Sequence, residues 1–88
     1  MATRRATIAS AHGLHARPAA MFVQAVKDSG LDVTIDKDGR EAPAGSILGV
    51  ISLAINQGDV VTLTAGGDNA ESVLDSLVAF LETDHDAE

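Results

Sequence analysis

One short stretch near the N-terminus combines residue types that could handle an anion. It runs from Gly13 to Ala19, reads Gly-Leu-His-Ala-Arg-Pro-Ala, and has His15 and Arg17 as its only titratable side chains. Pro18 is accepted in the first turn of a helix, where its missing N–H costs nothing, and the apolar run after it fits a helix. His15 would therefore stand at a helix N-terminus beside free backbone N–H groups, and Arg17 would add a permanent cation.

This placement predicts transfer of a phosphoryl group through His15. A helix N-terminus disfavours the imidazolium, so the ring would be neutral and nucleophilic at cytoplasmic pH. After transfer, the backbone N–H groups of Ala16 and Arg17, with the Arg17 guanidinium, would meet the new negative charge. A histidine beside a helix cap with no chemical task is the alternative. A metal site is not expected, because His12 and His15 lack a nearby third ligand and His85 stands in the tail.

Composition narrows the class of protein. A chain of 88 residues predicts a single domain over residues 1–88, and the absence of cysteine excludes a disulfide framework or thiolate zinc site. The net charge of −7, without a basic stripe, argues against nucleic acid as a partner. No apolar stretch approaches the ~20 residues that span a bilayer, so membrane insertion is not expected. We expect a cytoplasmic protein whose acidic tail, residues 84–88, serves solubility or a basic protein partner.

Hydrophobic periodicity predicts the elements that must position this stretch. Alternation of polar and apolar residues predicts four strands, at residues 3–9, 31–36, 40–42 and 60–65. Helical spacing predicts three helices, at residues 16–28, 47–55 and 70 to about 83. Asp38-Gly39 is a hairpin signal between the second and third strands. The order βαββαβα, with one apolar face for each element, predicts a two-layer α/β (α+β) sandwich with a largely antiparallel four-stranded sheet.

The sequence indicates N-terminal caps for the two later helices. Residues 47–55 are rich in β-branched types and could form a buried strand, but Ser46 is a good N-cap and favours a short helix. Leu48 would then be partly exposed. The buried face of that helix would consist of Ile47, Val50, Ile51 and Ala54. For the last helix, Asp68 and Glu71 have the spacing of a capping box.

The stretch from Gly13 to Ala19 resembles the active-site signature of the HPr family, the histidine-containing phosphocarriers of the bacterial phosphoenolpyruvate–sugar phosphotransferase system. The resemblance covers essentially the whole chain, and residues 46–50 are similar to the family's regulatory-serine segment. It implies an open-faced β-sandwich with three helices on one face of the sheet. It also implies that His15 accepts a phosphoryl group on Nδ1 from phosphorylated enzyme I and donates it to the IIA domain of a sugar-specific enzyme II. Arg17 would support the phosphate, and the protein would be a cofactor-free carrier, not an enzyme.

The resemblance further implies a shared partner surface near the first and second helices. Lys27, with Gln24 beside it, would line the rim, and a monomer is expected. The surface itself would include Ala16, Ala20, Ile47, Leu48 and Ile51. In many relatives a dedicated kinase phosphorylates the serine aligned with Ser46, so a serine kinase or phosphorylase is a further partner; the N-cap role also accounts for Ser46.

Two other functions share this sequence pattern. The first is a carrier of a regulatory, nitrogen-type branch of phosphotransfer that moves no sugar. The second is a module that binds a transcription regulator without being phosphorylated. That module would favour a lost histidine, and His15 is present, so the carrier functions are preferred.

Overall fold

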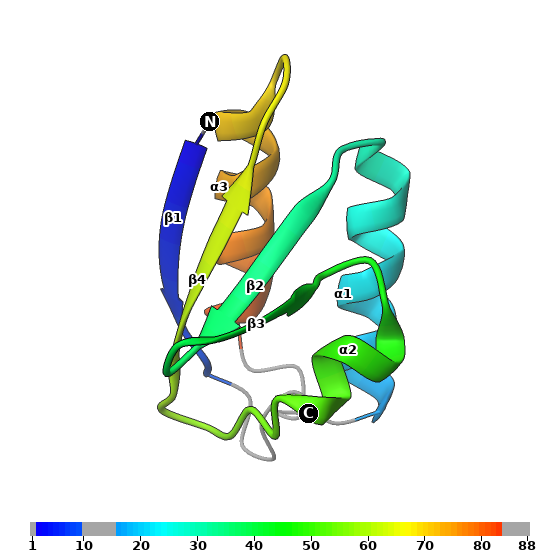
Figure 1. The fold of residues 1–88 in the computed structure, drawn as a ribbon. Coiled ribbons are helices and arrows are strands. Elements are labelled where there is room, and N and C mark those ends of the chain that lie inside the picture. The colour runs from blue at the N-terminus through cyan, green and yellow to red at the C-terminus, as the bar shows by residue number, and fades with distance from the viewer. Residues whose placement is uncertain (1, 10–15, 84–88) are drawn as a thin grey trace.

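The computed structural model describes residues 2–9 and 16–83. These residues form four strands and three helices in the predicted order βαββαβα (Figure 1). The strands are β1 (Ala2–Thr7), β2 (Val33–Lys37), β3 (Arg40–Pro43) and β4 (Val60–Ala65). The helices are α1 (Ala16–Ser29), α2 (Ile47–Ser52) and α3 (Ala70–Leu81). The start of α1 at Ala16 agrees with the predicted helix.

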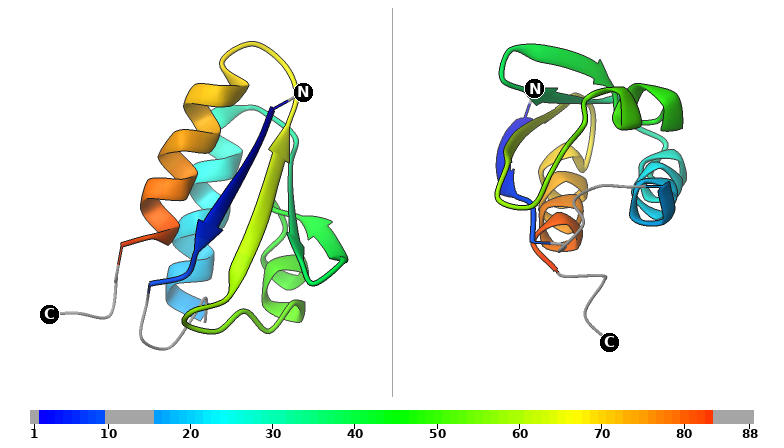
Figure 2. Two further views of the ribbon diagram at one scale, coloured as in Figure 1. Left: turned by 90° about the vertical axis from the view of Figure 1, so that its left-hand side faces the viewer. Right: turned by 90° about the horizontal axis from the view of Figure 1, so that it is seen from below.

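The four strands make one antiparallel sheet in the order β1-β4-β2-β3. The two long helices α1 and α3 run side by side against one face of the sheet, and the other face is open (Figure 2). The short helix α2 lies beside α1 and follows the edge strand β3 (Figure 1). This is the predicted open-faced sandwich. Pro43 ends β3, an edge strand, where its missing N–H breaks no ladder.

The core lies between the sheet and the helices and is almost entirely aliphatic. The predicted inward face of α1 is confirmed, because all four of its residues are buried: Ala19, Phe22, Val23 and Val26. The α3 face contributes Ala70, Leu74, Leu77 and Leu81. The rings of Phe22 and Phe80 lie 6.2 Å apart between their centroids, so the two aromatic residues of the chain meet where α1 and α3 pack together.

Helix α2 faces the core differently from the prediction. Ser46 is its N-cap as expected, but its buried contacts are made by Val50 and Leu53, which are 0% and 3% exposed. The predicted buried face is therefore wrong at three positions, which are exposed: Ile47, Ile51 and Ala54. The physical reason is the length of the helix, which ends at Ser52 and buries only Val50 of its own residues, with Leu53 buried at its C-cap. Ala54 lies beyond it with a φ of 52°.

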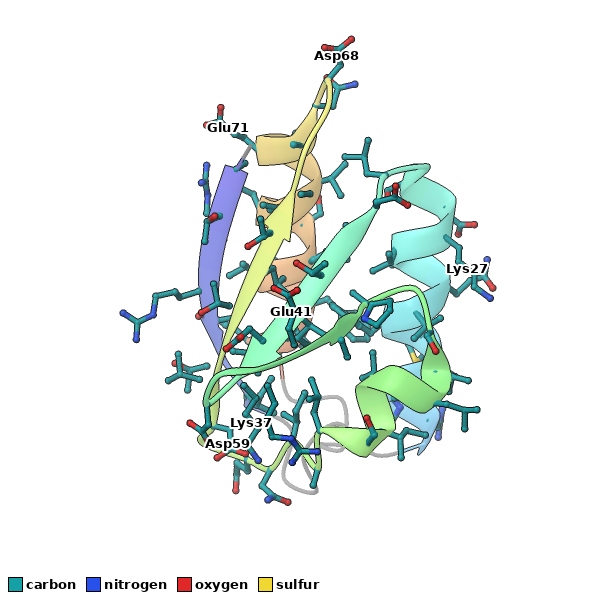
Figure 3. The ribbon with its side chains drawn as sticks, in the orientation of Figure 1. Lys27, Lys37, Glu41, Asp59, Asp68 and Glu71 are labelled. Atoms are coloured by element: carbon teal, nitrogen blue, oxygen red, sulfur yellow. The ribbon has the colours of Figure 1, made fainter. Side chains whose placement is uncertain are left out.

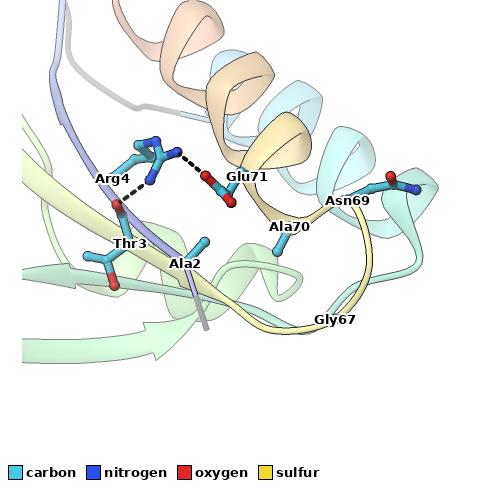
Figure 4. A pocket seen from close by; sticks show the side chains of 7 residues that line it. All are labelled: Ala2, Thr3, Arg4, Gly67, Asn69, Ala70 and Glu71. Atoms are coloured by element: carbon cyan, nitrogen blue, oxygen red, sulfur yellow. Dashed lines mark hydrogen bonds and ion pairs between the residues drawn. The ribbon is translucent and has the colours of Figure 1, made fainter.

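The start of α3 also differs from the prediction. Asn69 is the N-cap, with a left-handed φ of 67° and no side-chain cap hydrogen bond, so the predicted capping box of Asp68 and Glu71 is wrong (Figure 3). Glu71 Oε1 instead accepts a hydrogen bond from Arg4 Nη2 at 3.2 Å (Figure 4). The carboxylate thus pairs with a guanidinium from β1, a partner far away in sequence, and β1 is tied to α3.

The β2–β3 hairpin brings the cation of Lys37 to the carboxylate of Asp59. Its turn, Asp38-Gly39, has φ values of 54° and 85°, as the predicted hairpin signal requires. On the strand before the turn, the Lys37 ammonium lies 3.0 Å from Asp59 Oδ2 (Figure 3). The backbone N–H of Asn56 donates to the same oxygen at 2.7 Å. These two donors, the Asn56 N–H first and the Lys37 ammonium second, lower the pKa of Asp59.

We expect Asp59→Asn to lower the free energy of unfolding by about 1 kcal/mol at pH 7. The native carboxyl binds its proton less tightly than the unfolded one, so its stabilising contribution is present above the unfolded pKa of about 3.9. It is lost as the pH falls through the lower native pKa of Asp59. Urea denaturation at neutral pH and in acid measures this, and the gap between wild type and variant should close in acid.

The matched control is Asp68→Asn, which removes the same charge from an exposed turn residue. A gap between Asp59→Asn and wild type that stays constant with pH would contradict this account of Asp59.

Candidate functional site

The start of α1 is the first part of the candidate site. The helix begins at Ala16, the residue after His15 in sequence, and its first turn holds no acidic residue. Pro18 is fully buried there, while Arg17 is exposed. His15 lies outside the described residues, as do His12, His85 and the tail at 84–88. The described part of the site therefore offers a helix start, whose first N–H groups have no acceptor within the helix, and one cation, with no acidic residue in the first helical turn.

The second part is an apolar surface on α1 and α2. Leu48 is 78% exposed, the largest value among the exposed large apolar side chains of the described residues. Ile51 and Met21 follow with 43% and 47%, and Ile47 with 36%. These residues lie on two helices, α1 and α2, that contact each other (Figure 1). We call the set Ala20, Met21, Ile47, Leu48 and Ile51 the docking surface, because clustered exposed apolar residues mark interfaces.

The role of this surface in partner binding is a prediction. Sequence reasoning named four of its five residues, and all four are exposed: Ala20, Ile47, Leu48 and Ile51. It missed Met21, although helical spacing could have found it: Met21 follows Arg17 by four residues, one helical turn.

The predicted rim residues are exposed as well. Lys27 lies in the last turn of α1 and points away from the sheet (Figure 3). Gln24 Nε2 donates to Asp28 Oδ1 at 2.9 Å, so this amide is held along the helix. Helix α1 therefore carries an exposed cation in its last turn, in a chain of net charge −7.

Ser46 has a structural role at the start of α2. Its Oγ accepts a hydrogen bond from the Gly49 N–H at 3.2 Å, and its φ of −115° is extended, as an N-cap requires. The side chain is half-buried. Gly49 is also confined, because a Cβ there would lie 3.3 Å from the Pro43 carbonyl oxygen. The N-cap prediction for Ser46 is confirmed.

Within residues 2–9 and 16–83, no group of three His, Cys, Asp or Glu side chains is placed to hold a metal ion. Among the same residues, none of the helices is long and apolar enough to cross a membrane. A cleft of about 410 Å³, between β1 and the start of α3, is lined by Arg4, which is paired with Glu71 (Figure 4). Another cleft has Lys27 in its lining.

The chain thus combines an open-faced sandwich with the sequence Ala16-Arg17-Pro18 at the start of α1, directly after His15 in sequence, and with exposed apolar residues on α1 and α2. The family described as "PTS HPr component phosphorylation site" matches residues 2–83. The chain belongs to this family, the HPr phosphocarriers of the phosphotransferase system.

Individual relatives agree with this assignment. The phosphocarrier protein HPr of Streptomyces coelicolor is 42% identical, and the match covers 92% of this chain and 88% of that protein. A solved structure of HPr from Thermoanaerobacter tengcongensis is 39% identical, covers 100% of this chain and 99% of that one, and gives a TM-score of 0.92.

A second kind of relative is the HPr-like protein Crh of Bacillus subtilis. It is 44% identical over 70 residues, which cover 80% of this chain and 82% of that protein. Its crystal structure covers 96% of this chain and 97% of that one at 38% identity, gives a TM-score of 0.75, and is described as a domain-swapped dimer of a catabolite repression protein.

Proposed function

We propose that this protein carries a phosphoryl group on Nδ1 of His15, from phosphorylated enzyme I to the IIA domain of a sugar-specific enzyme II. The observation that carries the proposal is the sequence His15-Ala16-Arg17-Pro18 at the start of α1, in a chain that belongs to the HPr family. In the accepting step, a Nδ1–P bond forms as the bond between phosphorus and enzyme I breaks. In the donating step, the Nδ1–P bond breaks as phosphorus bonds to the acceptor group of IIA.

The start of α1 favours both steps. The helix N-terminus disfavours a charged ring before transfer, which keeps His15 nucleophilic. After transfer, the N–H groups of Ala16 and Arg17 and the Arg17 guanidinium would meet the negative charge of the phosphoryl oxygens. The stabilisation must stay modest, because a carrier that binds its phosphate too tightly passes it on slowly.

Incubation with phosphoenolpyruvate and enzyme I tests the proposal. We expect an acid-labile phosphoryl adduct on the protein, and its transfer to a IIA domain when one is added. An adduct that survives acid, or an adduct that no IIA domain can remove, would contradict the carrier function.

We expect Arg17→Ala to slow phosphoryl transfer several-fold while leaving the free energy of unfolding within about 0.5 kcal/mol of wild type. Arg17 is exposed, so its loss leaves no cavity, but it removes the cation next to His15. Stopped-flow transfer from enzyme I and urea denaturation make the comparison. The exposed Arg5 of β1, changed to Ala, is the control for a lost positive charge, and equal rates for both variants would count against Arg17.

We also propose that the docking surface binds enzyme I and the IIA domains, with Lys27 on its rim. The proposal is supported by the exposure of Leu48 and Ile51 on α2. Helix α2 lies beside α1, which begins with Ala16 and Arg17, the residues that follow His15. We place the carrier in the cytoplasm and expect it to act as a monomer, since each partner must reach the same surface. Sedimentation at the concentration used for transfer checks the monomer against the dimer described for Crh.

Phosphorylation of Ser46 by a serine kinase is the regulation we propose for this surface. A phosphate there would be favoured by the start of α2, and it would add about two negative charges beside Ile47 and Leu48. Incubation with the family's serine kinase and ATP should therefore yield an acid-stable phosphate, absent from Ser46→Ala, and slower transfer from enzyme I. If the wild type stays unmodified, Ser46 serves only as the N-cap, whose loss costs about 1 kcal/mol.

A second candidate function is phosphotransfer in a regulatory branch without sugar transport. The resemblance to Crh, whose structure is described as a catabolite repression protein, favours it. Phosphoryl transfer to IIA domains of sugar permeases and to those of a nitrogen-type branch, measured side by side, separates the two candidates. The faster acceptor identifies the branch.

A further inference from the structure

Helix α2 carries three residues of the docking surface, yet it has little intrinsic stability. It contains six residues, whereas isolated helices shorter than about 12 residues are marginal in water. Its last carbonyl groups also lack helical partners. The orientation of Leu48 and Ile51 toward a partner therefore depends on what holds the ends of α2.

The β2–β3 hairpin supplies the missing donors at the C-terminal end. Arg40 Nη2 donates to the Ser52 carbonyl at 3.1 Å. Lys37 Nζ donates to the Ala54 carbonyl at 2.8 Å and to the Leu53 carbonyl at 3.4 Å. Two cations thus meet the negative end of the α2 dipole, the sign that stabilises a helix C-terminus.

Lys37 holds this end more firmly than Arg40. Its side chain is only 17% exposed, and its ammonium finds a third acceptor in Asp59 Oδ2 at 3.0 Å (Figure 3). All three donors of the ammonium are therefore used, which a mostly buried cation requires. Arg40 is exposed and makes one contact to α2.

Asp59 extends the same network toward the segment before residues 10–15. Its carbonyl accepts from the Ile8 N–H at 2.9 Å. In the same turn, Gly58 N–H donates to the Ile8 carbonyl at 2.9 Å, and Gln57 Nε2 donates to the Ala9 carbonyl at 3.2 Å. The network of Lys37 and Asp59 thus joins the end of α2 to residues 8–9.

We propose that Lys37 is a positioning residue for phosphotransfer: with Asp59, it holds the C-terminal end of α2 and so orients Leu48 and Ile51 of the docking surface. Lys37 contacts neither Leu48 nor the start of α1 in any hydrogen bond or ion pair of the described residues, so its effect passes through the backbone of α2. This inference rests on the proposed function of the docking surface.

The test compares Lys37→Met with wild type as acceptor of phosphate from enzyme I. We expect the KM for the carrier to rise roughly fivefold while kcat stays within about twofold, because binding is lost and the chemistry at α1 is intact. Lys37→Arg should restore most of the KM, since it returns a cation to the carbonyl groups. Arg5→Met is the matched control for charge, because Arg5 is an exposed cation on β1, and it should keep the wild-type KM.

Hydrogen exchange of the free protein gives a second readout that needs no partner. The Leu53 and Ala54 N–H groups donate to Val50 and Ile51 carbonyls at the end of α2. In Lys37→Met we expect both amides to exchange at least about tenfold faster than in wild type, with Leu63 in the central strand β4 unchanged. Faster exchange at Leu63 as well would mean general destabilisation and would overturn the inference.

Failure of the inference and failure of the proposed function give different results. If wild type accepts no phosphate from enzyme I, the proposed function fails and the exchange rates alone decide whether Lys37 holds α2. If wild type is phosphorylated and Lys37→Met has an unchanged KM, the positioning role is wrong and the carrier function stands. An equal rise in KM for Arg5→Met would also overturn the inference, because it would be an effect of net charge.

Discussion

A His15→Ala variant incorporates no phosphoryl group from phosphoenolpyruvate and enzyme I under conditions that label the wild type. The imidazole is the only group of the Gly13–Ala19 stretch that can act as a nucleophile near neutral pH, and the chain has no cysteine to replace it. Serine hydroxyls are weak nucleophiles without an adjacent base. The measurement is the amount of acid-labile label on the protein, detected by gel autoradiography or by intact-protein mass spectrometry.

His12→Ala and His85→Ala are the matched controls for this experiment, since each removes one imidazole and leaves His15 in place. Both should be labelled as fast as the wild type. Label on His15→Ala at the wild-type rate would refute the central proposal. Loss of label in His12→Ala would mean that His12, and not His15, is the phosphorylated residue.

Leu48→Glu should raise the KM for phosphorylation by enzyme I roughly 30-fold, the factor that corresponds to about 2 kcal/mol at a central interface residue. The side chain is 78% exposed, so the free protein loses almost no buried contact. A carboxylate in the middle of the docking surface would have to be desolvated when a partner covers it. The free energy of unfolding should change by no more than about 0.5 kcal/mol.

Val60→Glu is the control for this second prediction. Val60 is 43% exposed, like Ile51, but it begins β4 and is not part of the docking surface. It should keep the wild-type KM. An unchanged KM in Leu48→Glu would mean that partners bind elsewhere, whereas equal defects in both variants would indicate a nonspecific effect of acidity.

The fold could be predicted from the sequence where a long element has one strong apolar face. The α1 face that includes Phe22 and Val26 is buried as its spacing predicts, and the hairpin at Asp38-Gly39 forms where its turn residues require. Local physics decides these features, because helical and strand periodicity acts over neighbouring residues. The family resemblance rests on the same kind of local signal, the seven residues from Gly13 to Ala19.

The features that could not be predicted depend on contacts between distant parts of the chain. Glu71 looked like one half of a capping box, but Arg4, from another element, binds it. The apolar spacing of α2 could not show that Ile51 faces outward, because spacing alone does not separate an exposed apolar face from a buried one. Lys37 gave no sequence signal at all, since its acceptors at Leu53, Ala54 and Asp59 meet it only after the hairpin has folded.

The pairing of β1 with β4 also dictates when the protein can fold during its synthesis. The register joins Ala2 to Ala65, and β4 is the only strand that β1 pairs with among the described residues. A nascent chain that has not yet released residue 65 from the ribosome therefore holds its first strand without a neighbour. Closing so long a loop is slow compared with forming a helix. His15 is therefore synthesised well before β4, the strand that gives β1 its neighbour in the sheet.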